Sequence, residues 1–201
     1  MIASKADILK FAELINTSAH VHQVFLAERS KYVQGVKNRH VKTEICHHLS
    51  PLEFFKVVKS MEAFVENKEC SVIYCTTNPR SSRKAARKFM EAFHTAIFDQ
   101  NNTFIENIAT EWSSTLMSSK GNHRYTTIDI DEMDLYPKVV NVFDERKVPF
   151  VEVKTRGGYH LLFEDNSIVP SLKKFEQNIG DVACPIPGTF QGGHQVTMKS
   201  S

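Results

Sequence analysis

The chain has 201 residues, enough for one domain with a sizeable core, and it is 41% hydrophobic and 24% charged, as in ordinary globular proteins. Its formal net charge is only +2, which argues neither for nor against a nucleic-acid partner. No apolar stretch approaches the roughly 20 residues that a membrane helix needs, so a membrane-spanning helix is excluded and no membrane partner is expected.

The cysteines suggest a reduced environment. They lie at positions without a CxxC pair: Cys46, Cys70, Cys75 and Cys184. The N-terminus lacks the basic region and apolar segment of a secretory signal, so we expect a cytoplasmic protein. His47 and His48 follow Cys46, but a lone "CHH" lacks the spaced partners of a structural zinc site.

Apolar residues at helical spacing predict a helical N-terminal part over residues 1–70. They are Ile8, Phe11, Leu14 and Ile15 in a first segment, and Phe54, Phe55, Val58, Met61 and Val65 in a second. The second helix should begin at "SPLE", where Ser50 is a good N-cap, Pro51 suits the first helical position and Glu53 completes a capping box.

The next segments predict a strand followed by two helices. "SVIYCTT" is rich in β-branched and aromatic residues and is stopped by "NPR", which indicates a buried strand. A helix should begin at Ser81, with one apolar stripe and a basic face within "RSSRKAARK" at 80–88. The simplest interpretation of that face is solvation. Residues 103–119 predict another helix, with Trp112 and Leu116 in the core.

The remainder of the chain predicts a mixed β-sheet with helices on one face. A strand ending in aspartates is followed by a helix over 135–147, a strand over 148–155, an "RGG" turn and a strand over 159–164. A short helix near 171–178, a loop and a last strand at 194–198 complete the chain. The fold class is therefore α+β, and no repeat divides the 201 residues into separate domains.

The stretch "TTIDID" carries the first candidate site. Strand side chains alternate between faces, so Asp129 and Asp131 share one face and Ile128 and Ile130 the other. Two carboxylates this close repel each other unless a cation lies between them, and Mg²⁺ favours such oxygen ligands. The alternative is a strand end that runs into a helix, capped by Asp131 or Asp134.

The stretch "KTRGGYH" carries the second candidate site. Gly157 and Gly158 should allow a tight turn with positive φ and close approach of a ligand to the backbone. His160 could then donate a hydrogen bond to a phosphate, with Thr155 and Arg156 adding a hydroxyl and a positive charge. The alternative is an ordinary hairpin with a half-exposed histidine.

Together, these stretches resemble the archaeo-eukaryotic primase superfamily, which includes primase-polymerases of viruses and plasmids. That family carries an hhhDhD strand, then a small-x-His motif, then a third acidic residue. "TTIDID" matches the first motif, and Gly158, Tyr159 and His160 match the second. "YCTTNPRSSRKA" and "PIPGTFQGG" look like the flanking strand, basic helix start and Pro-Gly loop. The resemblance covers about residues 71–198 and leaves the N-terminal helices unassigned.

The resemblance implies a catalytic core with an RNA-recognition-motif-like half, and a metal-dependent nucleotidyltransferase of DNA replication that adds nucleotides on a template. Asp129 and Asp131 would hold Mg²⁺ or Mn²⁺. Asp181, before the Pro-Gly loop, is the candidate third acid and metal ligand; Glu164 and Asp165 are alternatives. By this resemblance, a compact domain of this kind suits a bacteriophage or mobile element, and a viral protein of this kind is expected in the host cytoplasm.

The resemblance also suggests how substrates are held. His160 would act in catalysis and bind the incoming triphosphate, with Arg156, Thr155 and Gly158 around the nucleotide. Three basic residues at the start of the predicted helix, Arg80, Arg83 and Lys84, would contact template or nucleotide phosphates. The expected partners are nucleoside triphosphates, single-stranded DNA or a primer-template, and other replication proteins.

Two other functions compete with this one. A primase-like protein without catalysis could bind nucleotide or nucleic acid as a phage accessory or regulatory factor. The short apolar segment before Asp181 favours this alternative, because it makes Asp181 a weak match to the third acidic motif. A phosphoesterase with paired H-x-[ST] motifs ranks lower, because "HQVT" and "HVKT" place threonine three residues after histidine instead of two.

Overall fold

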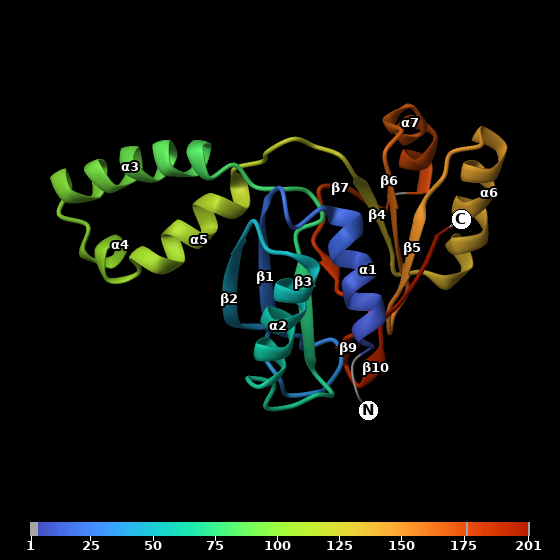
Figure 1. Ribbon diagram of the computed structural model, residues 1–201, viewed down its shortest axis with the longest axis horizontal. Coiled ribbons are helices and arrows are strands. Elements are labelled where there is room, and N and C mark those ends of the chain that lie inside the picture. The colour runs from blue at the N-terminus through green and yellow to red at the C-terminus, as the bar shows by residue number, and fades with distance from the viewer. Residues whose placement is uncertain (1–3, 176, 201) are drawn as a thin grey trace.

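The computed structural model describes residues 4–175 and 177–200 and has an α+β fold with two antiparallel sheets (Figure 1). The first sheet contains β1 (Val21–Glu28), β2 (Arg39–His47), β3 (Ser71–Cys75), β8 (Cys184–Pro185), β9 (Phe190–Gln191) and β10 (His194–Gln195). Its strand order is β10-β9-β3-β1-β2, with β8 paired to β3. The second contains β4 (Thr126–Ile130), β5 (Val151–Lys154), β6 (Tyr159–Phe163), β7 (Asn178–Gly180) and β11 (Thr197–Ser200), in the order β11-β5-β6-β4-β7.

The helices pack on the sheets or extend away from them. They are α1 (Lys5–Ile15), α2 (Pro51–Glu62), α3 (Ser82–Phe98), α4 (Asn102–Glu106), α5 (Ile108–Ser118), α6 (Tyr136–Arg146) and α7 (Val169–Leu172). Short 3₁₀ turns add η1 (Met133–Leu135), η2 (Asn166–Ile168) and η3 (Lys173–Phe175). Within residues 4–175 and 177–200, none of these helices combines the length and apolar character needed to cross a bilayer.

The α+β class is confirmed, whereas the prediction of a mixed sheet is wrong. Every pairing between the described strands is antiparallel. The predicted helical part over 1–70 is also wrong between α1 and α2, where β1 and β2 lie. Strand β1 is almost entirely buried on both faces, so its sequence lacks the apolar-polar alternation that marks a half-buried strand.

Two local predictions have different outcomes. Helix α2 begins as expected, because the Ser50 hydroxyl accepts from the Glu53 amide at 3.3 Å and the Glu53 carboxylate accepts from the Ser50 amide at 2.9 Å. The predicted helix at 171–178 ends early: α7 stops at Leu172, a 3₁₀ turn follows, and Asn178 already belongs to β7.

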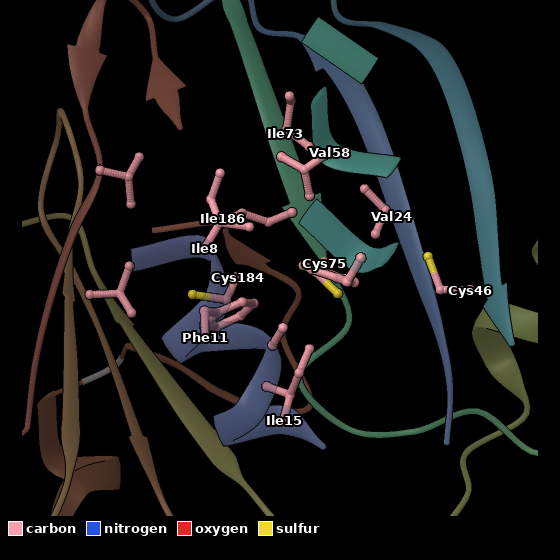
Figure 2. Close-up of a cluster of buried hydrophobic side chains, with 14 of the residues drawn as sticks. Ile8, Phe11, Ile15, Val24, Cys46, Val58, Ile73, Cys75, Cys184 and Ile186 are labelled. Carbon is pink, nitrogen blue, oxygen red and sulfur yellow. The ribbon is translucent and has the colours of Figure 1, made fainter. Parts of the chain in front are cut away.

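The larger core lies around α1, between the two sheets. Ile8 and Phe11 of α1 belong to one buried cluster with residues of the first sheet, including Val24, Cys75 and Cys184 (Figure 2). Helix α2 completes the cluster, and side chains from β5 and β6 enter it from the second sheet. Burial of this shared apolar surface is the main term that fixes the two sheets relative to each other.

A second core forms the outer layer of the second sheet. Ile128 and Ile130 of β4 pack with Val139 and Phe143 of α6 and with Phe163 of β6. From β4 to β7 the elements follow a β-α-β-β-α-β order, with the helices on this one face. The residues that alternate with Ile128 and Ile130 therefore point to the other face, toward the first sheet.

Helices α3, α4 and α5 form an arm that projects from the first sheet (Figure 1). The predicted helix over 103–119 is divided at Asn107. Aromatic rings fill the inside of the arm: Phe89, Phe93, Phe104 and Trp112. Its base packs on the sheet, where Leu116 and Ala85 meet Val21 and Ile45.

His22 on β1 predicts acid sensitivity of the fold. Its Nδ1 lies 2.8 Å from the Thr76 carbonyl oxygen and donates to it, and burial lowers the pKa of this imidazole from 6.5 to about 4. Between about pH 4 and pH 6.5, the His22 imidazole binds a proton in the unfolded chain but not in the folded chain. The free energy of unfolding should therefore fall as pH drops from about 6.5 to about 4, by up to roughly 3 kcal/mol from His22.

Urea unfolding between about pH 7 and about pH 4.5 measures this effect. The His22→Gln variant should lose much of the pH dependence, whereas His94→Gln, which removes an exposed histidine of α3, should keep it. Parallel pH profiles for His22→Gln and the parent would contradict the prediction.

Candidate active site

Asp129 and His160 form the centre of the candidate site. They are directly opposite each other on the adjacent strands β4 and β6, so their side chains share one face. The His160 Nε2 atom lies 3.3 Å from Asp129 Oδ1. His160 therefore faces Asp129 from β6, the strand paired with β5.

Asp131 follows β4 and joins this centre from its open side. Its side chain is 67% exposed, and its carboxylate lies 3.3 Å from Lys31 Nζ. The charges of Asp131 and Lys31 both act on the pKa of Asp129. The two aspartates and a lysine from the β1–β2 connection therefore converge on one region.

The electrostatics of the site are those of a partly buried acid beside a buried base. Burial is the main cause of a raised pKa for the Asp129 carboxyl, and the Asp131 charge acts in the same direction. The charges of His160, Lys31 and Arg29 oppose this shift. Burial also lowers the pKa of His160, against the effect of Asp129. A bound cation would stabilise both carboxylates in their charged form.

The two ring nitrogens of His160 have different environments. Its Nε2 faces Asp129, whereas its Nδ1 is buried and has no hydrogen-bond partner among the residues described. Since burial favours the neutral ring, Nε2–H can donate to the Asp129 carboxylate and orient it.

Gly158 allows the β5–β6 hairpin to approach the aspartates. A Cβ added to Gly158 would lie 1.9 Å from the Ile130 carbonyl oxygen and 3.2 Å from Asp131 Cα. The expected positive φ is absent at Gly157 and Gly158, so close packing is the reason for glycine here. Thr155 closes the turn, because its amide donates to the Gly158 carbonyl at 2.9 Å and its hydroxyl accepts from the Gly158 amide at 3.1 Å.

The Gly158→Ala variant should lose roughly 2 kcal/mol or more of unfolding free energy, because the added methyl group meets backbone that cannot rotate away. Gly157→Ala is the matched control, since a Cβ there has no neighbour within 4 Å. Urea denaturation of both variants measures the difference, and equal stabilities would refute the packing argument.

Arg156 is built into a wall beside the site. Its Nη1 atom donates to the Gly192 carbonyl at 2.8 Å and to the Glu69 carbonyl at 3.3 Å. Its guanidinium lies 5.1 Å from the centre of the Tyr32 ring, and the Tyr32 hydroxyl accepts from the Gln191 amide at 2.5 Å. These contacts connect the hairpin to the β1–β2 connection and the C-terminal loop.

The structure does not bring Asp181 to Asp129 and Asp131. The Asp181 carboxylate accepts from Arg80 Nη1 at 2.5 Å and from the Asn78 amide at 3.0 Å, and its side chain is 1% exposed. Since β7 runs antiparallel to β4 and Asn178 is opposite Asp129, Asp181 lies toward the other end of β4. Its predicted role as third metal ligand is corrected to that of a buried ion-pair partner.

The alternative third acids are also engaged elsewhere. The Glu164 carboxylate pairs with Arg124 Nε at 3.0 Å, and the Asp165 carboxylate accepts from the Ser167 amide at 2.9 Å. Across the two described ranges, no three His, Cys, Asp or Glu side chains are grouped so as to hold a metal ion. Asn178, exposed and on the same face as Asp129, is an oxygen donor that the sequence interpretation missed.

The predicted basic segment separates into two parts. Arg80 is buried in its pair with Asp181, so the prediction that it contacts phosphates is wrong for this conformation. Arg83 and Lys84 are exposed at the start of α3, and Lys84 Nζ donates to the Lys120 carbonyl at 3.1 Å. The cations beside the aspartates are instead Arg29 and Lys31.

Residues 29–42, which form the β1–β2 connection and the start of β2, hold several basic side chains, and this cluster was the available signal for Arg29 and Lys31. It was missed because residues 1–70 were interpreted as helical.

No protein-family model matches the chain, and no curated protein or solved structure is significantly similar to it, so any family assignment depends on the motifs and geometry described above.

Proposed function

We propose that this protein is a metal-dependent nucleotidyltransferase of the primase-polymerase type, which adds nucleotides to a nucleic-acid strand on a template. The observation that carries the proposal is the convergence of Asp129, Asp131 and His160 beside Lys31. The β-α-β-β-α-β order around them also agrees with the RNA-recognition-motif-like half that the resemblance implies.

The donor set fits a hard divalent cation in part. Asp129 and Asp131 would hold Mg²⁺ or Mn²⁺, and the amide oxygen of Asn178 could serve as a further ligand. Such a cation neutralises phosphate charge and activates the attacking hydroxyl. Lys31 would exchange Asp131 for a triphosphate oxygen, and His160 would keep the Asp129 carboxylate oriented. Binding of the triphosphate by His160 stays a prediction.

Primer extension tests the proposal directly. A labelled primer-template is incubated with the protein, deoxynucleoside or ribonucleoside triphosphates, and Mg²⁺ or Mn²⁺. We expect elongation that EDTA abolishes. No elongation in any combination of cation and nucleotide, with folding verified by circular dichroism, would refute the proposal.

A second candidate is a primase-like protein that binds nucleotide or nucleic acid without transferring it. The observation that favours it is the engagement of Asp181 with Arg80: within residues 4–175 and 177–200, no third carboxylate joins the aspartate pair. Calorimetric titration with a nucleoside triphosphate distinguishes the two functions: binding without elongation supports the second candidate.

A further inference from the structure

A groove of about 570 Å³ lies between α5 and the face of the first sheet that points away from α1 and α2. Its volume is within the range of small-ligand sites. The base of the arm covers this face at Val21 and Ile45 but leaves Phe25 and Ala27 to line the groove. The Gln23 side-chain amide holds α5 alongside β1, because it donates to the Ser113 hydroxyl and carbonyl oxygens.

The floor of the groove is a preorganised aromatic surface. The half-buried Phe25 ring is stacked on Tyr74 of β3, with centroids 5.2 Å apart and an angle of 23° between planes. The His40 ring meets Phe25 edge-on at 5.6 Å, and its Nε2 is 2.8 Å from the Thr43 hydroxyl oxygen. A π surface of this kind stacks with any nucleobase, so it suits a ligand of variable sequence.

The wall of the groove is polar and formed by α5. Its lining positions recur at helical spacing and mostly carry hydroxyl groups: Thr110, Ser113, Ser114, Met117 and Ser118. Serine and threonine hydroxyls commonly bind phosphate and sugar oxygens. The nine residues from Thr110 to Ser118 span about 12 Å along the helix axis, which is longer than the rise of a nucleic-acid strand, about 3.4 Å per nucleotide along a duplex.

The cation at the edge of the groove is Arg29. No carboxylate lies within 4.0 Å of its guanidinium in the part of the chain that the structure describes, and its buried Nε has no hydrogen-bond partner there. By contrast, Arg39 is paired with Glu28 at 3.0 Å. The Arg29 guanidinium lies 6.0 Å from the Tyr74 ring centre, and its charge acts on the pKa of Asp129. The unpaired charge therefore lies between the groove and the aspartates.

We propose that this groove binds a segment of single-stranded nucleic acid, with a base stacked on Phe25 and a phosphate held by Arg29. The inference rests on the proposed function, because it assigns the route by which a template strand reaches Asp129. In this binding mode the nucleic acid lies on β1 and α5. Arg83 and Lys84 at the start of α3 do not line the groove.

Anisotropy of a fluorescein-labelled oligo(dT), measured in EDTA without nucleoside triphosphate, tests the inference. Phe25→Leu keeps the apolar volume but removes the π face, and it should weaken binding at least about fivefold, while Phe25→Tyr binds like the parent. Arg29→Ala should weaken binding and reduce the slope of log affinity against log salt by about 0.7. Arg146→Ala, which removes an exposed arginine of α6 that does not line the groove, is the matched control and should change neither.

A second measurement identifies the contact directly. Photo-crosslinking of an oligonucleotide that contains 5-iodouracil should join a base to the peptide with Phe25, as read by mass spectrometry. Displacement of the oligonucleotide by thymidine monophosphate at comparable concentration would show that the groove holds a free nucleotide, and would overturn the strand assignment.

The outcomes separate this inference from the proposed function. A parent protein that binds the strand through Phe25 but never elongates a primer refutes the transferase and keeps the groove assignment. A parent that elongates primers while Phe25→Leu and Arg29→Ala bind normally refutes the groove alone. A folded parent without affinity for the oligonucleotide also refutes it.

Discussion

The Asp131→Asn variant is expected to lose nucleotide incorporation by at least about a thousandfold while its stability stays at the parental level. A bound cation contributes several kcal/mol to the transition state, and each 1.36 kcal/mol corresponds to a factor of ten in rate. The fold should tolerate the change because this side chain is 67% exposed and the neutral amide no longer repels the Asp129 carboxylate. Primer extension and urea denaturation measure the two effects.

Asp134→Asn provides the matched control for this experiment. Asp134 is also exposed and lies three residues further along, in η1, so the variant removes the same charge from the neighbourhood of the site. It should retain incorporation. Mn²⁺ affinity from electron paramagnetic resonance should fall in Asp131→Asn only. Equal activity of the two variants would end the metal assignment.

The largest stability effect should come from the buried pair of Arg80 and Asp181. Their side chains are 3% and 1% exposed and lie 2.5 Å apart. Asp181→Ala should lower the free energy of unfolding by about 3–5 kcal/mol, because it leaves the Arg80 charge buried without its partner. Chemical denaturation measures the loss, and the Arg80→Met, Asp181→Leu double variant should recover part of it.

An exposed ion pair tests whether burial is the cause. Arg87 Nε and Glu91 Oε1 on α3 lie 3.7 Å apart, with side chains 81% and 70% exposed. Glu91→Ala should therefore change the unfolding free energy by less than about 1 kcal/mol. Similar losses in Asp181→Ala and Glu91→Ala would contradict the importance assigned to the buried pair.

Local pattern predicted the second sheet far better than the first. Strand β4 alternates between buried isoleucines and polar residues, and the hairpin after β5 is marked by consecutive glycines, so these elements lie where the sequence placed them. Strand β1 has no such alternation because it is buried by α1 and α2 on one face and by the arm on part of the other. The sequence of β1 therefore lacks the two-residue apolar-polar repeat by which a strand is predicted.

The candidate site shows the same division between local and distant information. Asp129, Asp131 and His160 were predicted from two short motifs, and strand register brings them together. The contact between Lys31 and Asp131 joins residues 100 positions apart, and the pair of Arg80 and Asp181 spans 101. Such contacts depend on how the two sheets pack, so periodicity in one segment gives no signal for them.

The buried cysteines of the central core make the folded chain resistant to thiol chemistry. Burial raises the pKa of Cys46 to about 12 and those of Cys75 and Cys184 well above their ordinary value, so the reactive thiolate is scarce while the core is closed. Alkylating reagents should reach these sulfurs only through transient opening. Cys70, also buried but outside this cluster, would report a different opening. Labelling rates resolved by residue would thus measure how often α1 separates from the first sheet.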